Sequence, residues 1–213
     1  MVKQERAART RRALIRAAAE VFAEEGYTPA SLASICKRAG VSSGALHFHF
    51  ESKKMLAGAV EEQAARIVGR VIREAEERPD GDALQVLVDA THGLVRRIAE
   101  DAVVHAAFEL CGDPARGSDW APWRQWQSWV EEALRRIERD GLLARGVSAA
   151  DAATAVVAVT AGFEVLSGEN ERWLSEERVT GFWNLLLPRL TEGRVPRRAR
   201  PGAAASEPAA PAP

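Results

Sequence analysis

The sequence is poor in cysteine and has no long apolar run. Its 213 residues include only two cysteines, Cys36 and Cys111, and both fall in helical patterns. Two such cysteines give no disulfide framework, which is typical of a reducing compartment. The chain opens on charged residues rather than on a secretory apolar segment, and no apolar run approaches the roughly 20 residues that a membrane span needs. We therefore expect a soluble, cytoplasmic protein with no membrane partner.

Charge is nearly balanced over the chain as a whole but not along it. The formal net charge is -1, so no global excess points to a partner. Residues 1–54, however, hold ten Lys or Arg against five Glu, whereas the rest of the chain is acidic. A cationic N-terminal quarter on an acidic body indicates that one end meets a polyanion, although a solvated helix face would give the same pattern.

Helical periodicity runs through the sequence, and no stretch shows the alternation of a strand. Leu14, Ala18, Val21 and Phe22, for example, repeat on one face of a helix. We predict an all-α fold of about nine helices. They are expected over about 6–25, in two short segments that start near 32 and 42, and over about 52–76, 82–100, 102–111, 119–140, 148–167 and 175–191. Breaks are expected at Pro79-Asp80-Gly81 and at 112–118, and Pro188 is expected to kink the last helix or end it early.

The stretch GVSSGALHFHF, residues 40–50, allows three interpretations. Its first five residues match G-x-S-x-G, the pattern of a hydrolase nucleophile turn, but that turn follows a strand and here the preceding pattern is helical. His47 and His49 suggest a metal site, but two residues of a helix that are two apart point about 200° apart and do not converge. We therefore predict neither a catalytic residue nor a metal or cofactor.

The third interpretation, a helix-turn-helix, fits this stretch best. A short amphipathic helix, a turn with Gly40, and a second short helix make that motif, whose second helix lies in the DNA major groove. Ser42 and Ser43 then lie near phosphates or bases, and Gly44 allows close approach to the DNA backbone. Phe48 points away from the core and can cover a thymine methyl group. Lys53 and Lys54 follow in the first turn of the next helix, where cations oppose the helix dipole, which favours a phosphate partner.

Residues 10–60 resemble the DNA-binding region of TetR-family transcriptional repressors. The blocks IRAAAEVFAEEGY, AGVSSGALHFHF and SKKML come in that family's order and spacing. The sequence ALHFHF followed by SKKMLAGAVEEQ is most similar to the γ-butyrolactone receptor branch, including its relatives that answer to antibiotics or other signals. The resemblance implies a cytoplasmic homodimer that binds double-stranded operator DNA and is released by a ligand.

The resemblance also implies a set of DNA-contacting residues and three segments of the chain. The family often has Lys where this chain has Ser43, and Tyr where it has His47, so operator affinity or preference is expected to differ. The predicted segments are a helix-turn-helix DNA-binding domain at 1–51, a ligand-binding and dimerisation domain at 52–192, and a disordered Pro/Ala-rich tail at 193–213. The predicted DNA-binding residues are Arg6, Thr28, Ser31, Ser42, Ser43, Gly44, His47, Phe48, His49 and Lys53.

Four tryptophans at a spacing of three (Trp120, Trp123, Trp126 and Trp129) raise the question of a ligand pocket. They spread over about half of a helix surface, and only Trp123 and Trp126 share its apolar stripe. Core packing and the lining of an apolar cavity both fit them. Similarity to the butyrolactone-receptor branch places Trp123 at that branch's pocket tryptophan.

The other pocket candidates come from the inward faces of neighbouring predicted helices. Thr91 and Thr160 are polar groups on apolar faces, where they orient a ligand carbonyl or bond to their own helix backbone. The effector is expected to be small, mostly apolar and uncharged, such as a butyrolactone or a polyketide-like metabolite. The predicted ligand-binding residues are Trp123, Trp126, Leu87, Val88, Thr91, Val95, Val104, Phe108, Val156, Thr160 and Phe163.

The last two predicted helices are expected to form the dimer. The helix from about 148 is too apolar for a free surface, and the face with Trp183, Leu186, Leu187 and Leu190 resembles half of a four-helix interface. The sequence therefore predicts a ligand-responsive repressor. The alternatives are a related pseudo-receptor that answers to an antibiotic or a biosynthetic intermediate, and, with less support, an all-α enzyme; no set of acid, base and nucleophile is apparent, and we predict that the protein is not an enzyme.

Overall fold

The computed structural model describes residues 2–78, 82–113, 117 and 120–191, and within these ranges the fold is entirely helical. The predicted all-α class is confirmed. The predicted break at 79–81, part of the predicted loop at 112–118 and the predicted tail at 193–213 lie outside the described residues. In chain order the helices are α1 (Val2–Glu25), α2 (Leu32–Ala39), α3 (Ser43–His49), α4 (Lys53–Glu76), α5 (Ala83–Glu100), α6 (Ala102–Gly112), α7 (Ala121–Arg139), α8 (Ala149–Ser167), the short 3-10 helix η1 (Glu171–Leu174) and α9 (Glu176–Leu190).

Serine side chains begin five of these helices. The N-cap residues of α2, α3, α4, α8 and α9 are Ser31, Ser42, Ser52, Ser148 and Ser175, and each side-chain oxygen accepts a hydrogen bond from a backbone N–H of the first turn. Such caps satisfy N–H groups that have no partner within the helix. Thr28 lies in the turn before α2, outside any helix.

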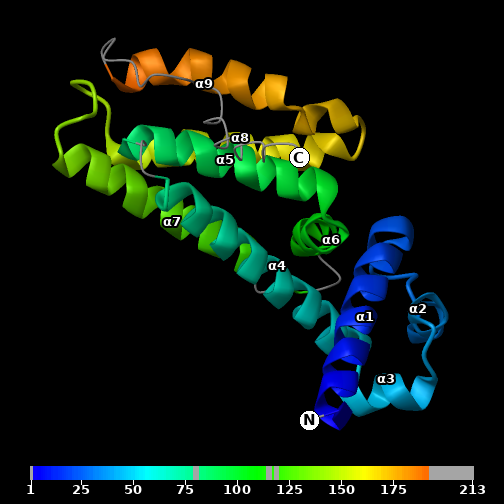
Figure 1. Cartoon of the computed structure of the whole chain (residues 1–213). Coiled ribbons are helices and arrows are strands. Elements are labelled where there is room, and N and C mark those ends of the chain that lie inside the picture. The colour runs from blue at the N-terminus through cyan, green and yellow to red at the C-terminus, as the bar shows by residue number, and fades with distance from the viewer. Residues whose placement is uncertain (1, 79–81, 114–116, 118–119, 192–213) are drawn as a thin grey trace, which may run out of the picture.

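The molecule has two ends joined by one long helix. Helices α1, α2 and α3 lie together at one end, α5, α7, α8 and α9 at the other, and α4 runs between them (Figure 1). Helix α6 packs against both α1 and α4 and also contacts α5. One continuous core of buried side chains runs through the whole molecule. The α1–α3 end is therefore linked to the larger end through α4 and α6.

Helix α8 is long and apolar enough to cross a membrane by length and composition alone. Its apolar length exceeds what we expected from the sequence, because alanine and valine fill most positions between Ala149 and Ser167. In this structure one face of α8 packs on α7, α5 and η1. One apolar face of α8 is therefore buried against neighbouring helices, whereas Val165 and Leu166 on another face are exposed.

Candidate DNA interface and effector-binding region

The turn between α2 and α3 is built from two helix caps. Gly40 ends α2 with a left-handed backbone (φ 65°), and its N–H bonds to the carbonyl of Lys37 at 3.3 Å. The N–H of Val41 bonds to the carbonyl of Cys36 at 3.1 Å, which completes a Schellman motif. Ser42 then begins α3, its hydroxyl accepting from the N–H of Ala45 at 3.2 Å. The G-x-S-x-G pattern is therefore a helix end followed by a helix start, and the serine is a cap.

One face of α3 is anchored and the opposite face is open. Leu46 is 1% exposed and Phe50, which follows the helix, is 3% exposed. Phe48 is 79% exposed, and Ser43, Gly44 and His47 are also on the surface. The Phe48 ring is therefore accessible to a partner molecule.

The other predicted DNA-contacting residues lie elsewhere in the α1–α3 end of the molecule. Arg6 is exposed near the N-terminus of α1, which lies beside α3 (Figure 1), and Thr28 and Ser31 are exposed in the segment before α2. His49 is half-buried, and its ring lies edge-on to Phe48 with centroids 5.1 Å apart. No cluster of His, Cys, Asp and Glu suited to a metal occurs within the described ranges. The positions of these residues do not test their predicted contacts with DNA, which remain predictions.

Lys53 has a structural role that the sequence did not reveal. Its ammonium group donates to the carbonyl oxygens of Tyr27 at 2.7 Å, Thr28 at 3.0 Å and Ala30 at 2.8 Å. It also lies 4.6 Å from the centre of the Tyr27 ring. A lysine ammonium has three donors, so all are used within the protein. Lys53 thus holds the segment before α2 against α4, and the neighbouring Lys54 is the exposed cation at this helix start.

An ion pair fixes α2 against α1. Arg38 of α2 donates to Glu24 of α1, with an Nη1–Oε1 distance of 2.8 Å, and approaches Glu20 at 3.5 Å. The hydrogen bond from Arg38 lowers the pKa of the Glu24 carboxyl. Because both groups are solvated, the ion pair contributes little to stability and mainly orients α2 relative to α1.

The residues predicted to bind an effector are all buried in the larger end of the molecule. All eleven are buried, and the most exposed of them, Trp123, is only 8% exposed. The Phe108 and Trp123 rings meet edge to face with centroids 4.5 Å apart. Trp126 donates through Nε1 to the Thr160 hydroxyl at 3.0 Å, which joins α7 to α8. The structure therefore brings these residues into one apolar region.

Both threonines bond to their own helices. The Thr91 hydroxyl donates to the carbonyl of Leu87 at 2.7 Å. The Thr160 hydroxyl lies 3.0 Å from the carbonyl of Val156 and 2.9 Å from that of Val157. Of the two alternatives that the sequence left open, the backbone bond is the one present here.

A buried donor in this region was missed by the sequence interpretation. Trp183 of α9 is fully buried, and its Nε1 has no hydrogen-bond partner in the described part of the chain. The expected assignment of Trp183, Leu187 and Leu190 to a dimer surface was wrong, because all three side chains lie inside their own chain's core, whereas Leu186 is half-buried. A buried indole N–H without an acceptor costs free energy.

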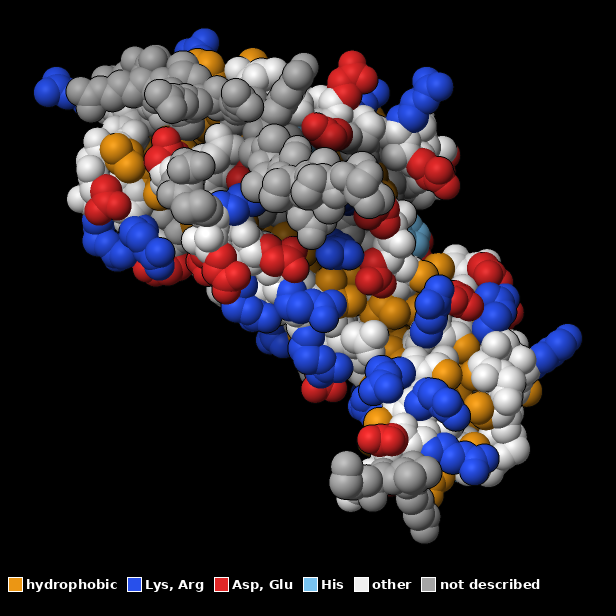
Figure 2. Space-filling model, viewed as in Figure 1, with side chains coloured by type: hydrophobic (Ala, Val, Ile, Leu, Met, Phe, Trp, Pro, Cys, Tyr) orange, Lys and Arg blue, Asp and Glu red, His pale blue; other side chains and the backbone are white. Residues whose placement is uncertain are grey.

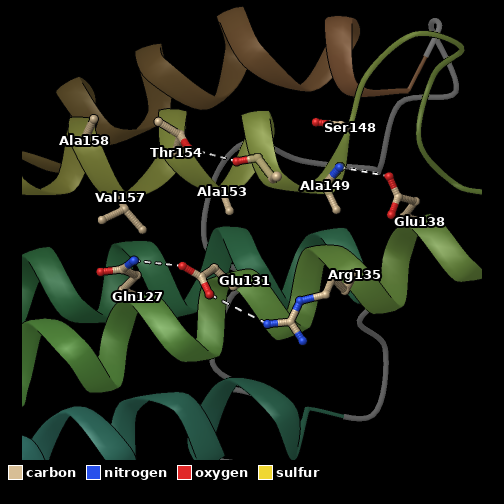
Figure 3. Close-up of a pocket in the computed structure, with 11 residues that line it drawn as sticks. Gln127, Glu131, Arg135, Glu138, Ser148, Ala149, Ala153, Thr154, Val157 and Ala158 are labelled. Atoms are coloured by element: carbon tan, nitrogen blue, oxygen red, sulfur yellow. Dashed lines mark hydrogen bonds and ion pairs between the residues drawn. The ribbon is translucent and has the colours of Figure 1, made fainter.

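Four hollows formed by described residues have volumes of about 600, 780, 470 and 420 Å³ and are lined by residues other than the eleven predicted ones. The 600 Å³ hollow is a groove between α7 and α8 (Figure 3). On its α7 wall, Gln127 donates to Glu131 at 2.8 Å, and Arg135 lies 3.7 Å from the same carboxylate. Its α8 wall carries the small side chains of Ala153 and Val157. This groove is half polar and differs from the enclosed apolar pocket that we expected.

A short amphipathic helix, a capped turn and a second helix with an exposed face define a helix-turn-helix DNA-binding regulator. Residues 14–60 match the family model described as bacterial regulatory proteins, tetR family. The chain is 28% identical to the A-factor receptor protein of Streptomyces griseus over 94% of its own length and 71% of that protein. It is 30% identical to the HTH-type transcriptional repressor BepR of Brucella suis, over 76% of this chain and 83% of BepR.

Solved structures agree with these relatives. A γ-butyrolactone receptor described as ArpA-like matches with a TM-score of 0.72 and 28% identity, over 87% of this chain and 90% of that one. The TetR-family protein CprB of Streptomyces coelicolor, in complex with its operator, matches with a TM-score of 0.72 and 26% identity, over 90% of this chain and 91% of that one. The chain belongs to the TetR family of bacterial transcriptional regulators, and within it is similar to γ-butyrolactone receptors.

Proposed function

We propose that this regulator represses transcription by binding a pseudo-palindromic operator as a homodimer and is released by a small apolar signal such as a γ-butyrolactone. The single observation that carries the proposal is the open face of α3, where Ser43 and Phe48 project from a helix whose other face is buried. The similarity to an operator-bound CprB structure supports this use of the helix. Such a protein acts in the cytoplasm, where its operator DNA is.

The DNA arm of the proposal is tested with the chain's own upstream region. Fluorescence anisotropy should show binding that weakens as salt rises, because phosphate contacts release counterions. Phe48→Ala should lower affinity by about tenfold, the effect of losing one good groove contact. The matched control is Met55→Ala, which removes another exposed apolar side chain, 52% exposed, from outside α3. Affinity that is independent of salt, or equal losses for the two variants, would contradict the proposed DNA face.

The effector is proposed to bind among the buried aromatic residues around Trp123 and Trp183. Phe108 and Trp123 supply apolar walls where α6 meets α7, and the Trp183 Nε1 is a buried donor elsewhere in the core, on α9, which packs on α5. A candidate lactone should quench tryptophan fluorescence and lower operator affinity. Trp183→Phe keeps an aromatic ring but removes the donor, so it should weaken the lactone response while leaving DNA binding intact. If Trp123→Ala and Trp183→Phe both respond like the parent, the effector lies elsewhere.

The dimer is proposed to use the exposed apolar face of α8 and α9. Leu185 is 77% exposed, Val165 is 69% exposed and Leu166 is 41% exposed. Phe182 of α9, half-buried, meets Phe163 of α8 with ring centroids 6.4 Å apart, so the two helices present one surface. A two-fold dimer through this surface sets two α3 helices about 34–36 Å apart or somewhat further, as a palindrome requires. Leu185→Glu should shift the protein to monomers in analytical ultracentrifugation, and an unchanged dimer would exclude this surface.

A further inference from the structure

A strongly basic hollow is lined by residues that belong neither to the exposed face of α3 nor to the aromatic core. It has a volume of about 780 Å³ and is formed by α1, α4 and α7. Figure 2 shows Lys and Arg side chains gathered along α4 and continuing over the lower part of α1. The hollow is lined by Arg11, Arg12, Glu62, Gln63, Ala65, Arg66, Ile67, Gly69, Arg70, Arg73 and Gln125.

The arginines of this hollow are poorly neutralised. The one acidic lining residue, Glu62, pairs with Arg66 at 2.9 Å. Arg12, Arg70 and Arg73 are exposed and form no ion pair within the described residues. Like charges held around one concave surface repel each other, and an anion placed among them relieves that repulsion.

The wall geometry concentrates these charges on a rigid frame. Arg66, Arg70 and Arg73 are spaced i, i+4 and i+7, so they share one face of α4. Helix α7 closes the hollow through Gln125, which comes close because Gly69 has no side chain. A Cβ atom at Gly69 would lie 2.8 Å from the Gln125 amide nitrogen.

We propose that this hollow binds a small, multiply charged anion that carries phosphate groups and is about the size of a nucleotide. The planar guanidinium group offers paired donors that match phosphate oxygens, which several arginines on different helices can contact together. The Gln125 amide adds a neutral polar group at the α7 wall.

Operator DNA is a less suitable occupant. Arg70 lies seventeen residues after Lys53 on α4, which places it roughly 25 Å along the helix axis from the α3 end. A duplex held by α3 therefore passes the start of α4 and stays far from Arg70 and Arg73, although Arg11 on the other wall packs on the Phe50 ring at the end of α3. The bound anion would instead touch Arg11 and Arg12 on α1 as well as Gln125 on α7, and so contact both ends of the molecule.

The direct test is calorimetric titration of the full chain with sodium tripolyphosphate at constant ionic strength. The parent should show saturable binding, and the double variant Arg70→Ala/Arg73→Ala should bind about tenfold more weakly, as expected for lost charge-assisted hydrogen bonds. The control is Arg96→Ala, because Arg96 is an exposed arginine on α5 outside the hollow. Circular dichroism checks that the variants are folded. Non-saturable binding, or equal losses in the control and the double variant, would overturn the proposal.

A second arm distinguishes free anions from DNA. The same variants are titrated with a short duplex that covers only the operator and with one extended on both sides. We expect the double variant to bind both duplexes with the parent's ratio of affinities. If it loses affinity only for the long duplex and keeps its tripolyphosphate binding, the arginines serve flanking DNA and the proposal is wrong. Because neither readout uses the lactone, this outcome is independent of the proposed effector response.

Discussion

Helices α3 and α9 show how differently the two ends of the molecule are determined. In α3 a single apolar anchor, Leu46, turns inward, and Phe48 is left in water because nothing else covers it. In α9 two faces are apolar, and either can turn inward. The structure buries Val179, Trp183, Leu187 and Leu190 and leaves Leu185 exposed. A helix with one apolar face has its orientation set by its own sequence, whereas a helix with two depends on what packs against it.

The largest expected loss of stability comes from a substitution in the core of the larger end. Trp126→Ala removes a fully buried ring and its bond to Thr160, so it should lower the free energy of unfolding by about 3–5 kcal/mol. Trp120→Ala, at the 49% exposed first member of the tryptophan series, should cost less than about 1 kcal/mol. Urea denaturation measures both. Equal losses of stability in the two variants would contradict the burial of Trp126 and the exposure of Trp120.

The second effect tests a buried acid in the same end. Burial, followed by repulsion from Glu109, raises the pKa of Glu164 to about 7 from 4.5, against an opposing effect of His105. The hydrogen bond that His105 donates to Glu109 also raises the pKa of His105. Both raised values mean that the folded state binds protons more tightly than the unfolded state. The stabilisation from Glu164 is present below pH 4.5 and is lost as pH rises through about 7.

Glu164→Gln removes the part of this pH dependence that belongs to the carboxyl. It should leave stability near the parent's at low pH and raise it by on the order of 2 kcal/mol at pH 8, where the parent must ionise a buried acid. Thermal unfolding from pH 5 to pH 8 measures the slope, with the exposed Glu74→Gln as the control. A parent slope that persists in Glu164→Gln would assign the effect to other groups.

The third prediction sharpens the comparison within the α2–α3 motif. Gly40 has φ 65°, and a Cβ atom added there would have no neighbour within 4 Å, so the role of Gly40 is backbone conformation alone. Gly40→Ala should cost about 1–2 kcal/mol of stability. Gly44 is helical, and a Cβ atom there would meet only the Ser42 Oγ, at an ordinary contact distance of 4.0 Å. Gly44→Ala should therefore stabilise the fold by about 0.5–1 kcal/mol while weakening operator binding. Unchanged DNA affinity in Gly44→Ala would show that the DNA backbone does not approach this residue closely.

The smallest effects separate two adjacent lysines. Lys53→Ala should lower stability by about 1 kcal/mol because three carbonyl groups lose their donor. Lys54→Ala should leave stability unchanged and weaken binding to all duplexes about two- to threefold, with a salt slope that is lower by about one. Anisotropy titrations at several salt concentrations distinguish them. If Lys53→Ala weakened DNA binding and Lys54→Ala lowered stability instead, Lys53 would be the residue that contacts phosphate.

Much of the fold and part of the candidate site could be predicted because their causes are local. The helical periodicity, the Gly40 turn and the motif that places α3 each depend on residues a few positions apart. The roles of Lys53, Trp183 and the arginines of the basic hollow could not be predicted in this way. Each depends on segments that are distant in sequence, such as the carbonyl groups of 27–30 for Lys53 and α1 and α7 for the arginines.

By itself, the sequence determined the nine α-helices of the described residues, the motif that places α3, and the family, because turns and periodicity act over one or two helical turns; the short helix η1 was not predicted. Only the tertiary structure decided three further features. These are which apolar face of α9 is buried, that Lys53 rather than Lys54 bonds to backbone carbonyl groups, and which arginines line the basic hollow. These features depend on which helices pack together and how close their side chains come. The residues next to a position in the sequence do not determine either quantity.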